Sequence, residues 1–304
     1  MNSRGTSVRI AGRTIEIGRP VKLLFEAAEI TKSELVDYYA TAAPVMLGHL
    51  SGRPLALRRF PNGIEHTGFF QKQRPDHAPS WISGETLERA TGGNITMVVA
   101  RTSPPLVWLA EQGTLTFHPW LSRADHPNHP DRLIVDLDPP GEELAPVLQA
   151  ARAVHTLLDE LELPGYPMTT GSRGLHVVVP LRRESDFDEA RAFAHELAEV
   201  LARRHPNLLT TQMRKNQRHG RLFVDTLRNA YGQHAVAPYS VRALANAPVA
   251  TPLWWAELDE LPSAQHWTLR TVGPRLEHDP WHGMGRRAHS LPRAHERLRQ
   301  LCGE

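Results

Sequence analysis

The sequence predicts an α+β protein with mainly antiparallel sheets flanked by helices. Apolar runs of strand length and amphipathic segments of helical length mix along the 304 residues without strict alternation. A helix is expected over about 32–47, because Thr31 and Glu34 form a capping box and apolar residues follow at helical spacing. The apolar run 132–138 and the β-branched segment 171–181, which opens on a glycine turn, indicate buried strands.

The remaining elements follow from the same two periodicities. Short β-branched or apolar runs bounded by turn residues predict further strands, at 53–60, 94–101, 114–118 and 221–225. Amphipathic spacing or a capping signal predicts further helices, at 104–112, 143–161, 187–204 and 292–301. The region after residue 243, rich in proline and tryptophan, has few periodic segments and is expected to wrap back over the core.

The composition is that of an ordinary globular protein, with 40% hydrophobic and 22% charged residues. The single cysteine, Cys302, excludes a disulfide framework and a cysteine-based zinc site, which fits a reducing, cytoplasmic compartment. We find no apolar run of about 18 residues and no secretory signal in the first ten residues. The sequence therefore predicts a protein with no membrane partner.

The basic residues are concentrated in two segments, although the net charge is only +2. Arginine and lysine far outnumber acids within 53–74 and within 203–242. Basic segments in a nearly neutral chain favour a polyanionic partner. The alternative is that arginine is simply the usual cation of this chain, and charge alone leaves both interpretations open.

Two aspartates interrupt the apolar run LIVDLDPP. Positions two apart on a strand share a face, so Asp136 and Asp138 point to one side while Val135 and Leu137 point into the core. Two neighbouring carboxylates need a counter-charge. Mg²⁺ or Mn²⁺ supplies one and accepts oxygen ligands. A pair of strand-end aspartates facing solvent or arginine is the alternative.

A third carboxylate, Asp225, ends the strand RLFVD inside the most basic segment. Together with the first two it would complete a site for two divalent ions that act on phosphorus. An ion pair between Asp225 and Arg228 or Arg221 is the alternative.

The stretch TGSRGLHV, residues 170–177, predicts an anion-binding turn. Gly171 and Gly174 permit tight turning and close approach of backbone N–H groups, while Ser172 and His176 add donors. It is neither a Walker A loop nor a Rossmann loop. An ordinary β-turn with a partly exposed histidine is the alternative.

The stretches TLTFHPWLSRADHP, RLIVDLDPP, TTGSRGLHVVVPL and RLFVDTLRNAYGQHAVAPYSVR occur in this order. Together they closely resemble the polymerase domain of bacterial DNA ligase D, a branch of the archaeo-eukaryotic primases. The resemblance implies a primase-type core with an RRM-like sheet. It also implies template-dependent addition of NTPs or dNTPs at gaps and double-strand-break ends during non-homologous end joining, with two Mn²⁺ or Mg²⁺ ions.

The resemblance assigns a role to residues throughout the chain. By motif position it implies metal ligands Asp136, Asp138 and Asp225; nucleotide contacts Ser172, His176, His118, Arg228 and Arg242; and DNA contacts Phe69, Phe70, Lys72 and Arg218. It implies a 5′-phosphate site at Lys22 and Lys32, with Arg19 where the family has asparagine. It implies one domain over 1–304, with an end-binding part at about 1–110, a catalytic core at about 111–242 and a C-terminal wrap at about 243–304.

The partners implied are 5′-phosphorylated DNA ends, nucleotides, the end-binding protein Ku and an ATP-dependent ligase, with a nucleoid-associated place in the bacterial cytoplasm. No KxDG adenylation motif occurs, so the expectation is a stand-alone polymerase or an excised domain. Two rival functions stay open. A DxD glycosyltransferase explains Asp136 and Asp138 but not Asp225 or the basic segments. An inactive module that binds 5′-phosphorylated ends explains the basic segments but not the carboxylates.

Overall fold

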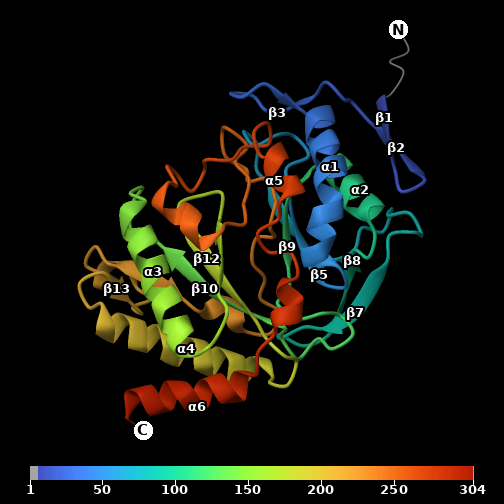
Figure 1. The fold of residues 1–304 in the computed structure, drawn as a ribbon. Coiled ribbons are helices and arrows are strands. Elements are labelled where there is room, and N and C mark those ends of the chain that lie inside the picture. The colour runs from blue at the N-terminus through green and yellow to red at the C-terminus, as the bar shows by residue number, and fades with distance from the viewer. Residues whose placement is uncertain (1–5, 304) are drawn as a thin grey trace. The chain divides into compact units, whose positions relative to one another are not determined.

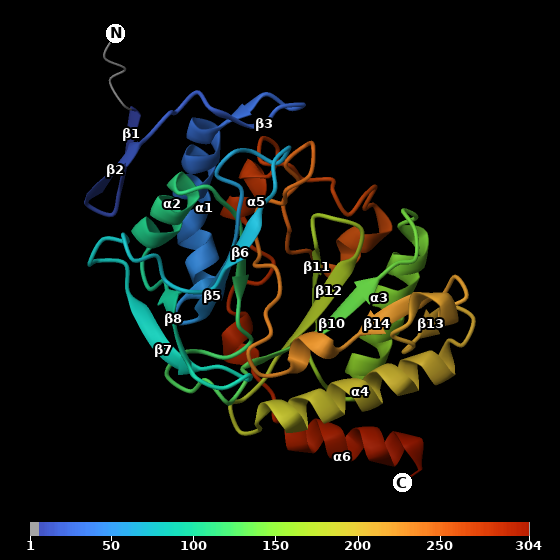
Figure 2. The ribbon, with the colours of Figure 1, turned by 180° about the vertical axis from the view of Figure 1, so that it is seen from behind.

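A computed structural model describes residues 6–303, which form two compact units (Figures 1 and 2). Both units are assembled from segments distant in sequence. Unit 1 comprises the N-terminal part to Trp120, His234–Thr251 and Trp267–Asp279; unit 2 comprises Leu121–Gln233, Pro252–His266 and Pro280 to the C-terminal part. The predicted mixed α+β class with mainly antiparallel sheets is confirmed. The region after residue 243 contributes to both units, and the single-domain organisation stays a prediction.

Unit 1 is built on an antiparallel sheet with the strand order β6–β5–β8–β7, to which β9 adds by pairing with β5. The sheet strands are β5 (Pro54–Arg59), β6 (Phe69–Gln71), β7 (Gly84–Glu88), β8 (Asn94–Val99) and β9 (Thr114–Pro119). Two small hairpins precede it, made of β1 (Thr6–Ile10), β2 (Arg13–Ile17), β3 (Leu23–Phe25) and β4 (Ile30–Thr31). Its helices are α1 (Lys32–Leu50), α2 (Ser103–Glu111) and the short α5 (Gly273–Glu277).

Helix α1 begins where the capping box predicts. The Thr31 hydroxyl accepts from the Glu34 N–H at 3.2 Å, and the Glu34 carboxylate accepts from the Thr31 N–H at 2.9 Å. The helix continues to Leu50, three residues beyond the predicted end, and contains Pro44. The apolar face of α1 is buried in the core of unit 1, which pays the entropy cost of ordering this helix.

Unit 2 is built on a five-stranded sheet with the order β11–β12–β10–β14–β13, antiparallel except for the β13–β14 pair. Its strands are β10 (Arg132–Asp138), β11 (Tyr166–Thr169), β12 (Leu175–Pro180), β13 (Leu209–Thr210) and β14 (Leu222–Asp225). Its helices are α3 (Ala145–Glu160), α4 (Phe187–Arg204) and α6 (Leu291–Cys302), with 3₁₀ turns at Lys215–Gln217, Leu227–Asn229, Trp255–Asp259 and Met284–Arg287.

Helices α3 and α4 contact the central strand β10 and each other, so they support the sheet from one side (Figure 2). Residues Val135 and Leu137 of β10 are fully buried, whereas Asp136 and Asp138 are only half-buried. Alternation along the strand therefore separates an apolar face from an acidic one, as predicted.

The C-terminal helix α6 lies along α4 in both views (Figures 1 and 2). Three of its residues, Leu291, Ala294 and Leu298, are buried. The helix is therefore partly buried, although its polar composition indicates an exposed helix. Among residues 6–303, no helix combines the length and the apolarity that crossing a membrane requires.

Candidate functional site

The acidic face of unit 2 carries the three predicted carboxylates side by side. Asp136 on β10 is directly opposite Asp225 on β14, and Asp138 follows two residues along β10. Directly opposite residues of antiparallel strands share a face, as do residues two apart. On the other side of β10, the residue opposite Asp136 is His176 of β12. Three neighbouring strands thus place His176, Asp136 and Asp225 in one row across the sheet.

Asp136 is held between two basic side chains. His176 Nε2 lies 3.4 Å from Asp136 Oδ1, and Arg228 Nε lies 3.5 Å from Oδ2. Burial alone raises the pKa of this carboxyl, but His176 and Arg228 outweigh burial and bring the pKa below its usual value. Asp136 is therefore ionised at neutral pH.

Asp138 lies between two arginines. Arg218 Nη1 is 3.4 Å from Asp138 Oδ2, and Arg173 Nη2 is 3.8 Å from Oδ1. Arg218 is buried, stacks on Phe223 at 4.1 Å and donates to the carbonyl oxygens of Gln212 and Met213. Arg218 therefore also anchors the basic loop that precedes β14.

Asp136 and Asp138 are paired with basic side chains in this structure. Among the described residues, 6–303, no three His, Cys, Asp or Glu side chains gather into a group ready to hold a metal ion. Instead, Arg173, Arg218 and Arg228 supply counter-charge, and His176 lies beside Asp136. These three arginines meet part of the need for positive charge that divalent ions are predicted to meet.

Asp225 is the least stabilised of the three carboxylates. Its Oδ1 accepts one hydrogen bond, from the Leu227 N–H at 2.8 Å. Burial raises the pKa of Asp225, and the charges of Asp136 and Asp138 raise it further, so the net shift is upward despite Leu227 and Arg228. Like-charge repulsion of this kind is what a bound cation relieves.

This shift predicts that Asp225→Asn stabilises the metal-free protein. A carboxyl whose pKa is raised on folding contributes stability at low pH, and that contribution is lost as the pH rises through the raised value. The variant is therefore expected to melt at a higher temperature than the wild type near neutral pH. The difference in melting temperature between the variant and the wild type is expected to decrease as the pH falls and Asp225 becomes protonated. Thermal unfolding in chelator at several pH values measures it; a lower melting temperature at neutral pH contradicts the repulsion.

The glycine turn before β12 is packed tightly against β10. The Thr170 hydroxyl donates to the Gly174 carbonyl at 3.0 Å and accepts from the Ser172 N–H at 3.3 Å. A Cβ at Gly174 would lie 2.2 Å from the Leu137 carbonyl oxygen, so only glycine allows this approach. The turn therefore fixes Ser172 and Arg173 next to the acidic strand.

One ring nitrogen of His176 makes no hydrogen bond within the part of the chain that the structure describes. The side chain is 4% exposed, and its Nδ1 is buried with no hydrogen-bond partner among the described residues. Buried polar atoms are nearly always paired. An unpaired one beside Asp136 is a feature that a ligand would explain.

Asn229 positions Arg228 against β10. The Asn229 side chain accepts from the Ile134 N–H at 2.8 Å and donates to the Ile134 carbonyl at 2.8 Å. It also donates to the Thr226 carbonyl at 3.0 Å and is 1% exposed. A buried asparagine thus continues the sheet's hydrogen bonding beyond the end of β14.

We expect Asn229→Ala to cost about 2 kcal/mol of unfolding free energy, because it leaves the buried Ile134 N–H without a partner. Denaturant unfolding measures this, with Asn207→Ala, at an exposed position of the same unit, as the control. Equal stability of the two variants contradicts this role of Asn229.

The predicted DNA and nucleotide contacts of unit 1 partly cluster. The rings of Phe70 and His118 are 5.3 Å apart, and both contact the ring of His234, at 5.4 and 5.2 Å. Phe69 and Phe70 are exposed at 44% and 48%, as side chains that stack on a base must be. Lys72 is exposed just after β6, and Arg242 is half-buried just after Val241.

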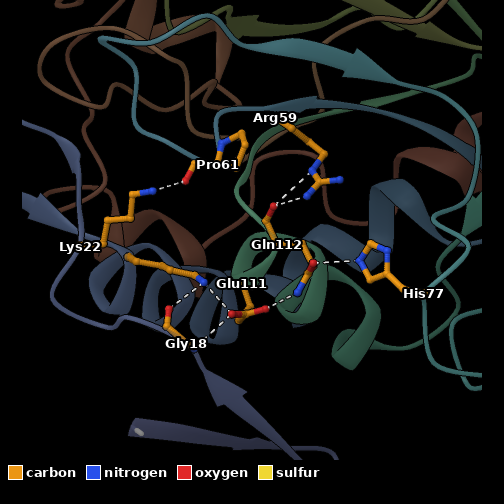
Figure 3. A network of polar contacts seen from close by, with 8 residues as sticks. Gly18, Lys22, Arg59, Pro61, His77, Glu111 and Gln112 are labelled. Atoms are coloured by element: carbon orange, nitrogen blue, oxygen red, sulfur yellow. Dashed lines mark hydrogen bonds and ion pairs between the residues drawn. The ribbon is translucent and has the colours of Figure 1, made fainter. Parts of the chain in front are cut away.

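The three predicted 5′-phosphate residues line one pocket of unit 1, with a volume of about 300 Å³. Its lining includes four cationic side chains, Arg19, Lys22, Lys32 and Arg59. Figure 3 shows the polar network around it. Arg59 donates to the Gln112 carbonyl through Nε and Nη2, at 3.2 and 2.6 Å. Burial lowers the pKa of Arg59, and the Glu111 carboxylate opposes that shift.

Several residues of these sites were not singled out from the sequence. Arg173 is part of the quoted turn, but only the three-dimensional pairing shows that it reaches Asp138. Asn229 carries no signal beyond its place in FVDTLRN. The pocket residues Arg59, Asn62, Glu111 and Gln112 come from the end of β5 and the turn after it, and from the end of α2, and no local pattern marks them.

The fold and site define a class: an α+β protein whose strands β10 and β14 present carboxylates next to basic side chains. A model of the LigD primase-polymerase domain family matches residues 31–281. The chain belongs to this family, so the resemblance in the motifs is confirmed.

Similar proteins and a similar solved structure come from the same family. The multifunctional non-homologous end joining DNA repair protein LigD of Mycobacterium tuberculosis is 37% identical over 267 residues, covering 85% of this chain and 35% of that protein. LigD of Pseudomonas aeruginosa is 36% identical over 286 residues, covering 92% of this chain and 34% of that protein. The chain thus spans about a third of the length of these relatives. The polymerase domain of M. tuberculosis ligase D, solved in complex with DNA, superposes with a TM-score of 0.84 at 34% identity and covers 90% of this chain and 99% of that one.

Proposed function

We propose that this chain is a template-dependent nucleotidyltransferase that adds NTPs or dNTPs to a 3′ end at gaps and double-strand-break ends during non-homologous end joining. The observation that carries the proposal is the row of acids across β10 and β14 with basic side chains on both flanks. Family membership supports the same reaction class.

The donor set of the acidic face suits Mg²⁺ or Mn²⁺. Asp136, Asp138 and Asp225 offer carboxylate oxygens, the ligands these ions prefer, and the pKa of Asp225 is raised by burial and, further, by the charges of Asp136 and Asp138. These three residues would hold the two ions. Bound divalent ions would increase the acidity of the primer 3′-hydroxyl and stabilise the charge of the leaving pyrophosphate.

The basic side chains then act on phosphate oxygens. Arg173 and Arg228 are paired with the acids here, and once cations neutralise the acids these guanidiniums become available to an anionic ligand. Ser172 adds a hydroxyl donor beside them, and His176 offers a buried ring nitrogen with no hydrogen-bond partner among the described residues. Their role is to orient the triphosphate and to stabilise the charge that develops on it.

Unit 1 supplies most of the DNA contacts of the proposal, and Arg218 of unit 2 is assigned to the DNA primer. The exposed rings of Phe69 and Phe70 suit stacking on template bases, and Lys72 suits a backbone phosphate. His118 and Arg242 are assigned to the nucleotide. The pocket lined by Arg19, Lys22 and Lys32 is assigned to the 5′-phosphate of a DNA end. Ku and an ATP-dependent ligase stay predicted partners.

The test is extension of a gapped duplex with a 5′-phosphate at the downstream end. We expect the purified chain to add nucleotides in Mn²⁺ or Mg²⁺ and to add none in chelator. Tight binding to phosphorylated ends without any addition identifies an inactive end-binding module. Transfer from a nucleotide sugar to an acceptor, with no DNA extension, identifies a glycosyltransferase. Either result overturns the proposal.

A further inference from the structure

The cationic pocket of unit 1 contains an acid. Glu111, the last residue of α2, is 8% exposed and lines the pocket. Its Oε1 lies 2.6 Å from Lys32 Nζ, which also donates to the Gly18 carbonyl at 2.9 Å. A buried carboxylate in a site assigned to an anion opposes binding, so it calls for an explanation.

Both lysines of the pocket are held in the same way. Lys22 Nζ donates to the Pro61 carbonyl at 2.7 Å and to Asn62 Oδ1 at 2.9 Å. An ammonium group has three N–H donors. In each lysine, two donors are used by the protein and one remains for a ligand. The difference is that the acceptors of Lys22 are neutral, whereas one acceptor of Lys32 carries a full negative charge.

Glu111 is itself fixed in place, so it cannot swing aside when an anion arrives. Its Oε1 accepts from the Gly18 N–H at 3.2 Å, and its Oε2 accepts from Gln112 Nε2 at 2.5 Å. The Gln112 amide oxygen is in turn 3.0 Å from His77 Nε2, and Arg59 holds the Gln112 backbone (Figure 3). The carboxylate thus shares one ammonium group with any bound phosphate.

We propose that Glu111 is a specificity-determining residue that weakens the hold of the pocket on a 5′-phosphate. This inference rests on the phosphate-binding role proposed above. The carboxylate fixes the Lys32 ammonium and repels the phosphate, so a phosphorylated end binds and leaves readily. Repulsion acts more strongly on a terminal phosphate monoester, with a charge near −2, than on an internal phosphodiester. Glu111 therefore limits the preference for phosphorylated ends. Rapid release leaves the 5′-phosphate of the DNA end free for the joining reaction that follows.

Glu111→Gln separates positioning from repulsion, because glutamine keeps an oxygen acceptor for Lys32 and removes the charge. We expect the variant to bind a recessed 5′-phosphorylated duplex about tenfold more tightly than the wild type, which corresponds to about 1.4 kcal/mol. Affinity for the same duplex with a 5′-hydroxyl is expected to change little. The ratio of the two affinities therefore rises, which loss of structural integrity alone does not produce.

The experiment measures both affinities by fluorescence anisotropy, without divalent ions or nucleotide, so that the acidic face of unit 2 does not contribute. Glu85→Gln is the matched control, because Glu85 belongs to the same unit and forms an exposed ion pair with Arg101. Should Glu111→Gln not fold, Glu111→Ala is used instead; it is expected to raise the same ratio by less, because Lys32 loses an acceptor.

Three outcomes are distinguishable. A phosphate preference in the wild type that increases in Glu111→Gln but not in Glu85→Gln supports the inference. A wild-type preference that stays equal or falls in Glu111→Gln overturns the inference and leaves the phosphate pocket intact. A wild type that binds both duplexes equally overturns the phosphate pocket and the inference together.

Discussion

Replacing Asp136 and Asp138 together by asparagine is expected to reduce nucleotide addition to a gapped duplex by about 10³-fold or more. The carboxamides keep the shape of the side chains but remove the charge that would hold the divalent ions. Asp136 lies between His176 and Arg228, and Asp138 lies between Arg173 and Arg218. The loss therefore leaves four basic groups without their anions and the proposed ions without two ligands.

The measurement is primer extension in Mn²⁺ and in Mg²⁺, with Asp159→Asn as the control, because Asp159 is an exposed aspartate of the same unit. Circular dichroism and melting curves establish that the double variant is folded. Addition that persists at the wild-type rate in a folded double variant means that the acidic face of β10 does not carry the chemistry.

Gly174→Ala is expected to have the largest effect on stability of any single methyl group added near the site. The new Cβ would lie 2.2 Å from the Leu137 carbonyl oxygen, which belongs to backbone of the acidic strand and not to a flexible side chain. Relief requires β10 or the turn to shift, at a cost of about 3 kcal/mol. The same shift displaces Asp136 and Asp138, so nucleotide addition falls together with stability.

The matched control is Gly141→Ala, which adds the same methyl group in the loop after β10, where no atom lies within 4 Å. Denaturant unfolding and primer extension are measured on both variants. If Gly174→Ala is as stable and as active as Gly141→Ala, the turn does not support the acidic strand in the way that the close approach indicates.

Elements with strong local signals were predicted well. Helix α1 begins at the residue that the capping box indicates, and β10 occupies the residues read from its apolar run. Among the strands that were not predicted, β7 has a weak local pattern. Strand β7, GETLE, is largely polar, and it forms because β8 pairs with it along its whole length. Pairing between strands is a tertiary interaction, and propensity within a segment does not reveal it.

The sequence predicted which three aspartates form the acidic face, but it did not predict how they are arranged across the sheet. Strand periodicity places Asp136 and Asp138 on one face, whereas the position of Asp225 opposite Asp136 depends on the register between distant strands. The same register brings His176 beside Asp136. For the pocket of unit 1, the motif comparison supplied Lys22 and Lys32, but Glu111 and Asn62 were found only through the fold.

The dependence of nucleotide addition on the template base tests the proposed template-dependent nucleotidyltransferase activity most directly. A gapped, 5′-phosphorylated duplex is prepared in four versions that differ only in the template base opposite the gap, and each nucleotide is offered singly in Mn²⁺. We expect the complementary nucleotide to be added preferentially in all four versions and chelator to abolish addition. Addition that is indifferent to the template base, or that proceeds in chelator, would contradict a metal-dependent, template-directed nucleotidyltransferase.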